Sequence, residues 1–262
     1  TITDELNAAG TNAVIRVGGN WTQPGIFAAG TNSTVIFDGA AAQVVNITQG
    51  TAGNEDFEFV QVTNPAGVTV TNGGNGDWNI ADNLTVDGGL LILNDTTDVA
   101  VDVFVLNGGT ITANQDFDVQ DDLSITGGTV TLNDVSTVND DLMVDNGTLT
   151  VSATGTLTSV DNLTLTTGGQ AVFNGNSTVD QVFLGSNAAT GGTLTVNAGT
   201  TLTVFYTSEA QGDPAILLFR DSTINGGGTI QENAGSYVSL GLTGAANQDA
   251  TLTLNNNLNV RW

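Results

Sequence analysis

Residues 82–109 read DNLTVDGGLLILNDTTDVAVDVFVLNGG, and this stretch contains one structural repeat and the start of the next. An alternating segment follows Asp82, a Gly-Gly pair precedes a second apolar segment, and a third short segment at Val99–Val101 leads to Asp102. Alternation of apolar and polar residues is typical of a strand with one buried face. The stretch therefore predicts three short strands separated by turns.

The same pattern recurs about every 20 residues. It starts at Asp82, Asp102, Asp121, Asp140 or Asp141, Asp161 and Asp180. Each start is followed by a Gly-Gly or Asn-Gly pair, which suits a turn with positive φ, and then by a second strand such as TVTL or TLTV. Because such short strands cannot bury a face alone, the repeat predicts coils that stack ~4.8 Å apart.

The expected fold class is all-β: a parallel β-helix (β-solenoid) with three short strands per coil of about 20 residues. Alternation predicts which side chains point toward the core. The predicted inward residues are Leu84, Val86, Leu123, Ile125, Leu142, Val144, Leu163 and Leu165. The predicted outward residues are Thr85, Ser124, Met143 and Thr164. The competing interpretation is an antiparallel β-sandwich, which also has many short strands but does not require an internal repeat.

We expect one continuous domain with three regions. Residues 1–18 form an N-terminal cap and first strand, residues 19–204 form regular coils, and residues 205–262 form irregular C-terminal coils with a terminal strand. In the cap, Thr3 suits the N-cap of a short helix that ends at Gly10, with Asp4 and Glu5 in its first turn. Such a helix would cover the apolar end of the first coil.

The composition excludes several classes of function. The chain has 27 Asp and Glu against three Arg, a net charge of -24, and neither His nor Cys. Nucleic-acid binding is excluded because no basic patch can form. His triads, Cys nucleophiles, Schiff-base lysines, P-loops and Cys/His zinc sites lack their residue types. No apolar run approaches the ~18 residues of a membrane span, so we expect no membrane insertion.

The recurring aspartates are the candidate metal ligands. If Asp82, Asp102, Asp121, Asp140, Asp141, Asp161 and Asp180 formed one column, each neighbouring pair would repel by ~0.9 kcal/mol even in bulk water. One interpretation is that these carboxylates cap turns by accepting backbone N–H bonds and stay solvated. The other is a calcium ladder, completed by Asn83, Asp122 and Asn162. No cofactor is required on either interpretation, and calcium is the candidate.

The stretch GNWTQPGIFAAGTNSTVIFDGAAAQVV, residues 19–45, carries a further motif. It resembles the GxWxxxGxFxxGxxTVxFxGxxxQ segment of large repetitive bacterial surface proteins, including adhesins and autotransporter-like passengers. The matching residues are Trp21, Gly25, Phe27, Gly30, Thr34, Val35, Phe37, Gly39 and Gln43. The helix expected before Ala13–Val17 is also similar to the entry of pectate-lyase-like β-helices. The resemblance implies an extracellular or cell-surface location and supplies no catalytic residue.

An enzymatic function is not expected. Polygalacturonase-like β-helices use clustered Asp residues as general acids and bases. Here the Asp residues recur regularly, and Arg16, Arg220 and Arg261 are too far apart in sequence to hold an anionic sugar together. Trp21, Trp78 and Trp262 would suit sugar stacking if exposed, although single aromatics in coils are more often core residues.

The two ends of the chain suggest self-association. The last residues, LNVRW, form an alternating strand that no charged helix or polar tail follows. The start at Thr1 rather than Met fits a secreted product whose targeting segment was removed. We therefore expect a structural subunit of an extracellular filament built by head-to-tail stacking, or alternatively an adhesin rod that binds glycans or other cells. The expected interface residues are Ile2, Leu6, Val14, Ile15, Leu258, Val260 and Trp262.

Overall fold

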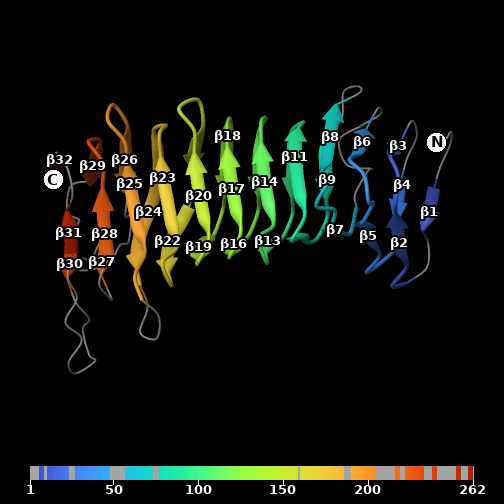
Figure 1. Cartoon of the computed structure of the whole chain (residues 1–262), viewed down its shortest axis with the longest axis horizontal. Coiled ribbons are helices and arrows are strands. Elements are labelled where there is room, and N and C mark those ends of the chain that lie inside the picture. The colour runs from blue at the N-terminus through green and yellow to red at the C-terminus, as the bar shows by residue number, and fades with distance from the viewer. Residues whose placement is uncertain are drawn as a thin grey trace.

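The computed structural model is a rod in which successive coils of one chain stack along the long axis (Figure 1). It describes residues 6–8, 11–23, 27–47, 57–72, 77–158, 160–185, 190–204, 216–218, 222–232, 238–240, 252–254 and 259–261. Neighbouring coils pair in parallel in every sheet, as in Leu84 with Val103 and Leu91 with Ile111. The expected parallel β-helix is therefore confirmed. Among the described residues no helix has the length and hydropathy that crossing a bilayer requires.

Three sheets run along the rod, one for each strand of a coil. The first sheet contains β2 (Val14–Val17), β5 (Thr34–Phe37), β7 (Phe59–Val62), β10 (Leu84–Asp87), β13 (Val103–Leu106), β16 (Leu123–Thr126), β19 (Asp141–Asp145), β22 (Val160–Thr166), β24 (Ser177–Leu184), β26 (Thr201–Val204), β27 (Ile216–Leu218), β29 (Thr229–Glu232), β30 (Val238–Leu240) and β32 (Asn259–Arg261). The second contains β3 (Trp21–Gln23), β6 (Gln43–Ile47), β8 (Val68–Asn72), β11 (Leu90–Asn94), β14 (Thr110–Ala113), β17 (Thr129–Leu132), β20 (Thr148–Val151), β23 (Gln170–Phe173), β25 (Thr193–Val196), β28 (Ser222–Asn225) and β31 (Leu252–Leu254).

The third sheet is shorter. It contains β9 (Trp78–Ile80), β12 (Thr97–Val99), β15 (Phe117–Val119), β18 (Val135–Val138) and β21 (Thr156–Thr158), and a separate pair joins β1 (Leu6–Ala8) to β4 (Phe27–Ala29). From β24 onward, the third strand of each coil pairs within the first sheet and no longer forms a separate third sheet. The start of β24 pairs with β26 and its end pairs with β27, so one long strand supplies both positions.

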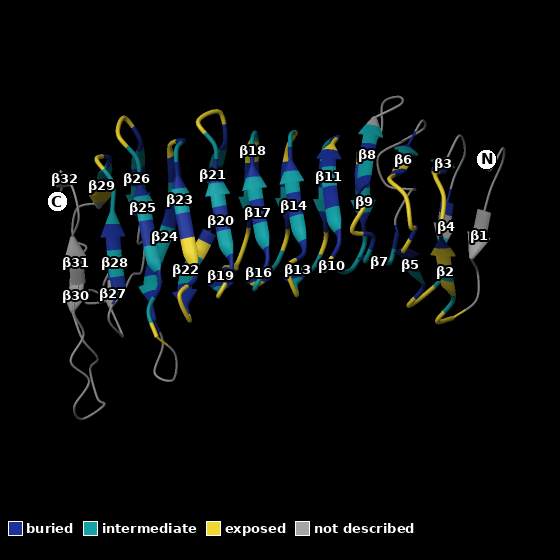
Figure 2. Ribbon diagram, viewed as in Figure 1, coloured by how far each residue is buried: buried dark blue, intermediate teal, exposed yellow. Residues whose placement is uncertain are grey.

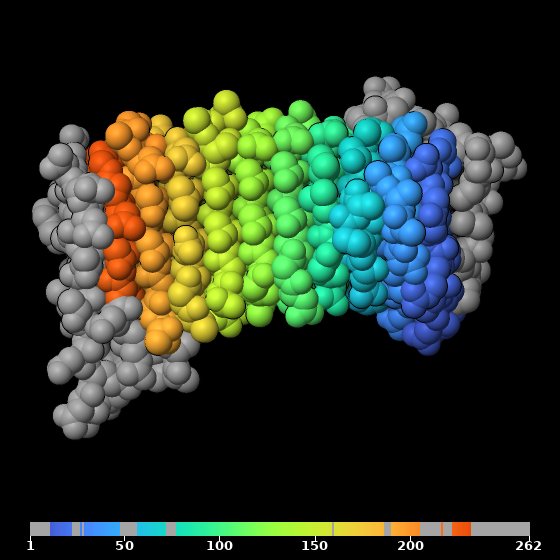
Figure 3. Space-filling model, viewed as in Figure 1, coloured from blue at the N-terminus to red at the C-terminus, as the bar shows by residue number. Residues whose placement is uncertain are grey.

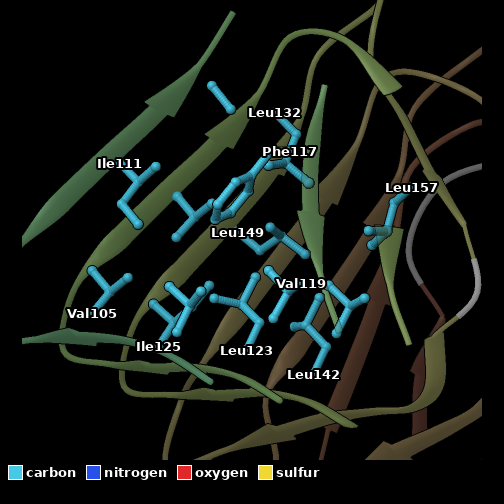
Figure 4. Close-up of a cluster of buried hydrophobic side chains, with 14 of the residues drawn as sticks. Val105, Ile111, Phe117, Val119, Leu123, Ile125, Leu132, Leu142, Leu149 and Leu157 are labelled. Atoms are coloured by element: carbon cyan, nitrogen blue, oxygen red, sulfur yellow. The ribbon is translucent and has the colours of Figure 1, made fainter. Parts of the chain in front are cut away.

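The core is a continuous column of aliphatic and aromatic side chains inside the coils (Figure 4). All eight predicted inward residues, from Leu84 to Leu165, are 0% exposed. The four predicted outward residues are intermediate or exposed, with Met143 at 38%. Buried and less buried residues alternate along the central strands such as β10, β14 and β20, and Figure 2 shows the buried and intermediate segments of these coils. This pattern confirms the predicted facing.

The turns between the first and second sheets explain the Gly pairs. At the first turn position, Gly88, Asn107, Gly127, Asn146 and Thr167 all have positive φ, between 51° and 68°. The glycine that precedes the second strand has no room for a side chain in several coils. A Cβ on Gly109 would lie 2.3 Å from the carbonyl oxygen of Val86, and one on Gly169 would lie 2.0 Å from that of Val144. Close stacking of coils therefore requires glycine at these two turns.

The expected N-terminal capping helix is wrong for the residues that the structure describes there. Leu6–Ala8 form strand β1, and Leu6 pairs with Phe27 of the next coil. An adjacent coil offers partners for backbone N–H and C=O groups, so a strand satisfies them as a helix would. Thr3, Asp4, Glu5 and Gly10 lie outside the described residues.

Candidate functional site

The recurring aspartates occupy two adjacent columns, not the single column expected from the sequence. The core positions Leu84, Val103, Leu123 and Leu142 are aligned across coils. One residue before them lies the inner column: Asn83, Asp102, Asp122, Asp141, Asn162 and Gln181. One residue earlier still lies the outer column, with Asp82, Asp121, Asp140, Asp161 and Asp180. The sequence pattern mixed the columns because Asp102 and Asp141 directly precede the core residue, whereas the others stand two positions before it.

Residues of the inner column are linked from coil to coil by hydrogen bonds along the rod axis. The amide of Asp102 donates to Oδ1 of Asn83 at 3.0 Å, and the amide of Asp122 donates to Oδ1 of Asp102 at 3.2 Å. The amide of Asp141 donates to Oδ1 of Asp122 at 3.0 Å, and Nδ2 of Asn162 donates to Oδ1 of Asp141 at 2.6 Å. Asp102 therefore accepts a backbone N–H bond, as the capping interpretation predicts, and Asp122, which that interpretation did not include, does the same.

Five carboxylates of three successive coils converge on this ladder. Oxygen atoms of Asp102, Asp121 and Asp122 lie within 4.8 Å of one another, and so do those of Asp122, Asp140 and Asp141. Asp122 belongs to both groups and is the link between them. Of the remaining predicted ligands, Asp82, Asp161 and Asp180 lie outside both groups.

Burial and neighbouring carboxylates raise the pKa of two members of the cluster, Asp122 and Asp140. Desolvation raises the pKa of Asp122, the amide of Asp141 lowers it, and the charges of Asp141, Asp121 and Asp102 raise it, with a net increase. The pKa of Asp140 is also raised, by desolvation first and then by the neighbouring carboxylates. A hard cation with oxygen ligands, such as calcium, has the chemistry to relieve this repulsion, as does protonation.

A second acidic strip on the third sheet was missed by the sequence pattern. Asp98 of β12 and Asp118 of β15 are paired residues in adjacent strands. Desolvation, followed by Asp118, Asp77 and Asp116, raises the pKa of Asp98. The signal was present in the sequence as the TDV and FDV segments, where an Asp stands at the outward position of the third strand.

Gln43 of the motif at residues 19–45 lies in a buried hydrogen-bond network near the first coils, whereas Gly25 of that motif lies outside the described residues. Gln43 is 1% exposed, and its Nε2 donates to the carbonyl oxygens of Val17 and Gly19 at 2.7 and 2.6 Å. Its Oε1 accepts from the amide of Gly39 at 3.0 Å and from Nδ2 of Asn64 at 2.9 Å. The motif therefore stabilises the junction of adjacent coils.

The tryptophans of this region belong to the core. Trp21 is 6% exposed and Trp78 is 1% exposed. Trp21 stacks edge-on against Phe27 with ring centroids 5.3 Å apart, and Phe57 lies between Trp21 and Trp78. Sugar stacking by Trp21 and Trp78 is excluded in this conformation because their ring faces are covered. Trp262 lies outside the described residues.

The predicted interface residues are only partly described. Val14 is 61% exposed on β2, and Ile15 of the same strand packs partly against the core. Leu6 and Val260 lie in strands β1 and β32, for which the backbone alone is described. Ile2, Leu258 and Trp262 lie outside the described residues.

The fold defines the chain as a parallel β-helix repeat protein. Comparison with protein-family models, with curated proteins and with solved structures finds no match. The function must therefore be argued from the geometry of this rod alone.

Proposed function

We propose that the protein is a structural, non-enzymatic subunit of an extracellular or cell-surface filament, formed by head-to-tail stacking of β-helices. The observation that carries the proposal is the match between the two ends of the described stack. β2 and β3 begin the first and second sheets; at the opposite end of the rod, β30 and β32 end the two branches of the first sheet and β31 ends the second (Figure 1). A second copy set on the first would continue both sheets in parallel.

The backbone of β2 is suited to this contact. Among the described strands, β2 pairs on one side only, with β5. The amides of Thr34 and Asp38 donate to the carbonyl oxygens of Ala13 and Val17. Alternate residues of a parallel strand direct their backbone groups to opposite sides, so those of Val14 and Arg16 point toward the open edge. Unpaired edge groups of this kind are a template for pairing with another chain.

The contact between such copies is heterologous, because one end of the rod meets the opposite end of the next. A heterologous contact that does not close into a ring propagates into a fibre. Mechanical stiffness would follow from the continuous parallel ladder, and the absence of Lys leaves few cleavage points for basic-specific proteases. The proposed secreted location is consistent with an acidic, cysteine-free chain, and its partner is another copy of itself.

The alternative function is the rod of an adhesin that binds glycans or other cells. The buried positions of Trp21 and Trp78 weaken it, because aromatic faces exposed for sugar stacking are then lacking at these residues. A polysaccharide lyase or hydrolase is the distant alternative. Arg16, the one Arg whose side chain is described, forms an ion pair with Asp38 at 2.6 Å. It therefore does not provide the five-carboxylate cluster with a basic group that could hold an anionic sugar.

Calcium is the proposed optional ligand of the five-carboxylate cluster. Calcium would stabilise the folded protein, because a cation that binds only the folded chain shifts the folding equilibrium toward the folded state.

Electron microscopy of the purified protein tests the filament. Fibres of constant diameter with an axial repeat set by stacked coils support the structural function. Single rods that are retained on a glycan surface support the adhesin, and release of new reducing or unsaturated sugar ends supports an enzyme. Single rods in every buffer, without fibres, would overturn the proposal.

A further inference from the structure

The second sheet presents the one face of the rod whose strands carry no charge, within the strands that the structure describes. Its 11 strands contain no Asp, Glu or Arg. By contrast, strands of the first sheet carry residues such as Arg16, Asp87 and Asp141, and the third sheet carries Asp98 and Asp118. In a chain of net charge -24 this separation is a distinct feature of the surface.

The face is regular because the register keeps equivalent positions in line. In β14, β17 and β20 both outward positions are threonine: Thr110, Thr112, Thr129, Thr131, Thr148 and Thr150. Each of these side chains is partly exposed. In β11 the same two positions are Leu90 and Ile92, so methyl groups predominate over the whole array. Figure 3 shows the described coils of this side as adjacent parallel ridges without a deep hollow between β11 and β23.

Threonine and aliphatic side chains on a flat sheet cost less to dehydrate than carboxylates do, because a hydroxyl loses less on leaving water than an ionised group. The dimensions are also sufficient. Strands β6 to β28, at ~4.8 Å spacing and ~3.3 Å per residue, give a face of about 43 by 13 Å, or ~560 Å² per copy. Two copies would bury ~1,100 Å², which clears the ~1,000 Å² expected of a specific interface.

We infer that this neutral threonine face, the outward side of the second sheet, is the surface through which two copies of this chain pair side by side. Charge restricts where two copies of this chain can meet. A second copy carries the same net charge of -24, so the copies can approach closely only where neither presents a carboxylate. The contact is isologous, because the same patch of each copy faces the other. In a filament the contact repeats along the length, so a weak pairing per copy becomes strong by avidity.

This lateral contact is independent of end-to-end stacking, and the two respond differently to experiment. Small-angle X-ray scattering gives the mass per unit length of a rod regardless of how long the rod is. In EGTA, we expect the mass per unit length of the wild type to double between 0.01 and 0.5 M NaCl. Over about this range the Debye length falls from ~30 Å to a few Å, which screens the repulsion between the acidic faces.

The discriminating variant is Thr131→Asp with Thr150→Asp, which places two charges on paired positions of the face. The matched control is Ser124→Asp with Met143→Asp, which adds the same charges at paired outward positions of the first sheet. The first variant should keep the single-rod mass per unit length at all salt concentrations, whereas the control should double as the wild type does. Far-UV circular dichroism melts establish that both variants are folded.

Three results would overturn the inference. The first is a wild type that stays single at 0.5 M NaCl, and the second is equal loss of pairing in the variant and its control. The third is binding of single wild-type rods to an insoluble neutral polysaccharide, lost in the Thr131→Asp, Thr150→Asp variant. That result would assign the face to a different partner.

Discussion

The side chain of Gln43 occupies the space that a Cβ atom on Gly39 would need. A Cβ there would lie 2.7 Å from Cδ of Gln43 and 2.8 Å from the carbonyl oxygen of Gly18. The Gly39 amide donates to Oε1 of the same glutamine at 3.0 Å. Because Gln43 also bonds Val17 and Asn64, the pair joins strands of successive coils through buried polar groups. Such groups are costly to leave unpaired.

Replacing Gly39 by Ala should destabilise the protein by about 1–3 kcal/mol, because the new methyl group must displace Gln43 and strain its hydrogen bonds. Denaturant unfolding measures the change. Gly19→Ala is the control, because nothing lies within 4 Å of a Cβ at that position. Equal effects of the two substitutions would contradict the role of the Gly39–Gln43 contact.

Ser152→Asn should stabilise the rod by about 1 kcal/mol. The amide of Asn133 donates to Asn114 at 2.7 Å and that of Asn197 donates to Asn174 at 2.6 Å, so an asparagine ladder follows the second sheet. Ser152 occupies the equivalent position between Asn133 and Asn174 and interrupts the ladder. Nδ2 of Asn174 donates to the carbonyl oxygen of Val151 instead. The substitution would join the segments, and the gain must exceed the loss of the bonds that the Ser152 hydroxyl makes with the Gly155 amide and with Thr154, both at 3.2 Å. A melting temperature equal to or below that of the wild type would argue against a continuous ladder.

Thr167→Asn should also stabilise the fold, by about 1 kcal/mol. Thr167 has a φ of +52°, a region that is strained for a β-branched residue, whereas Asn107 and Asn146 hold the equivalent turn position with similar φ. Thermal unfolding provides the measurement. Asn146→Thr, at the equivalent turn position, should lower the melting temperature. A melting temperature that Asn146→Thr leaves unchanged would contradict the strain at this position.

Stability should increase as the pH falls from 7 toward about 4.5. Desolvation and neighbouring carboxylates raise the pKa of Asp82, Asp98, Asp116, Asp122, Asp140 and Asp180 above the ordinary 3.8. Between 3.8 and the raised values the folded chain binds more protons than the unfolded chain, so this stabilisation is present at low pH and is lost as the pH rises. A melting temperature that falls steadily from pH 7 to 4.5 would contradict it.

Calcium should raise the melting temperature, and Asp122→Asn should reduce that increase, because Asp122 is shared by both carboxylate groups. The amide oxygen of the variant can still accept the bond from Asp141, so the backbone contact is kept. Asp98→Asn, on the third sheet, is the control and should leave the calcium effect intact. A wild-type melting temperature that is the same in calcium and in EGTA would exclude the site.

The sequence was sufficient to predict the coil, because turn glycines and strand alternation are local properties. The positions of Leu84 and Leu123 in the core followed from alternation alone. The register of the aspartates could not be read in the same way, since the number of residues between Asp and the first core residue differs between Asp102 and Asp121. The burial of Trp78 and the pairing of β1 with β4 depend on neighbouring coils, which no local pattern encodes.

The most direct test of the account compares fibre length in electron micrographs for the wild type, Val14→Pro and Val14→Thr. Proline removes an N–H that points to the open edge of β2 and leaves the bonds to β5 in place, whereas threonine keeps the N–H. The account predicts long fibres for the wild type and Val14→Thr, and short rods for a folded Val14→Pro. Fibres of equal length in all three proteins would contradict stacking through this edge.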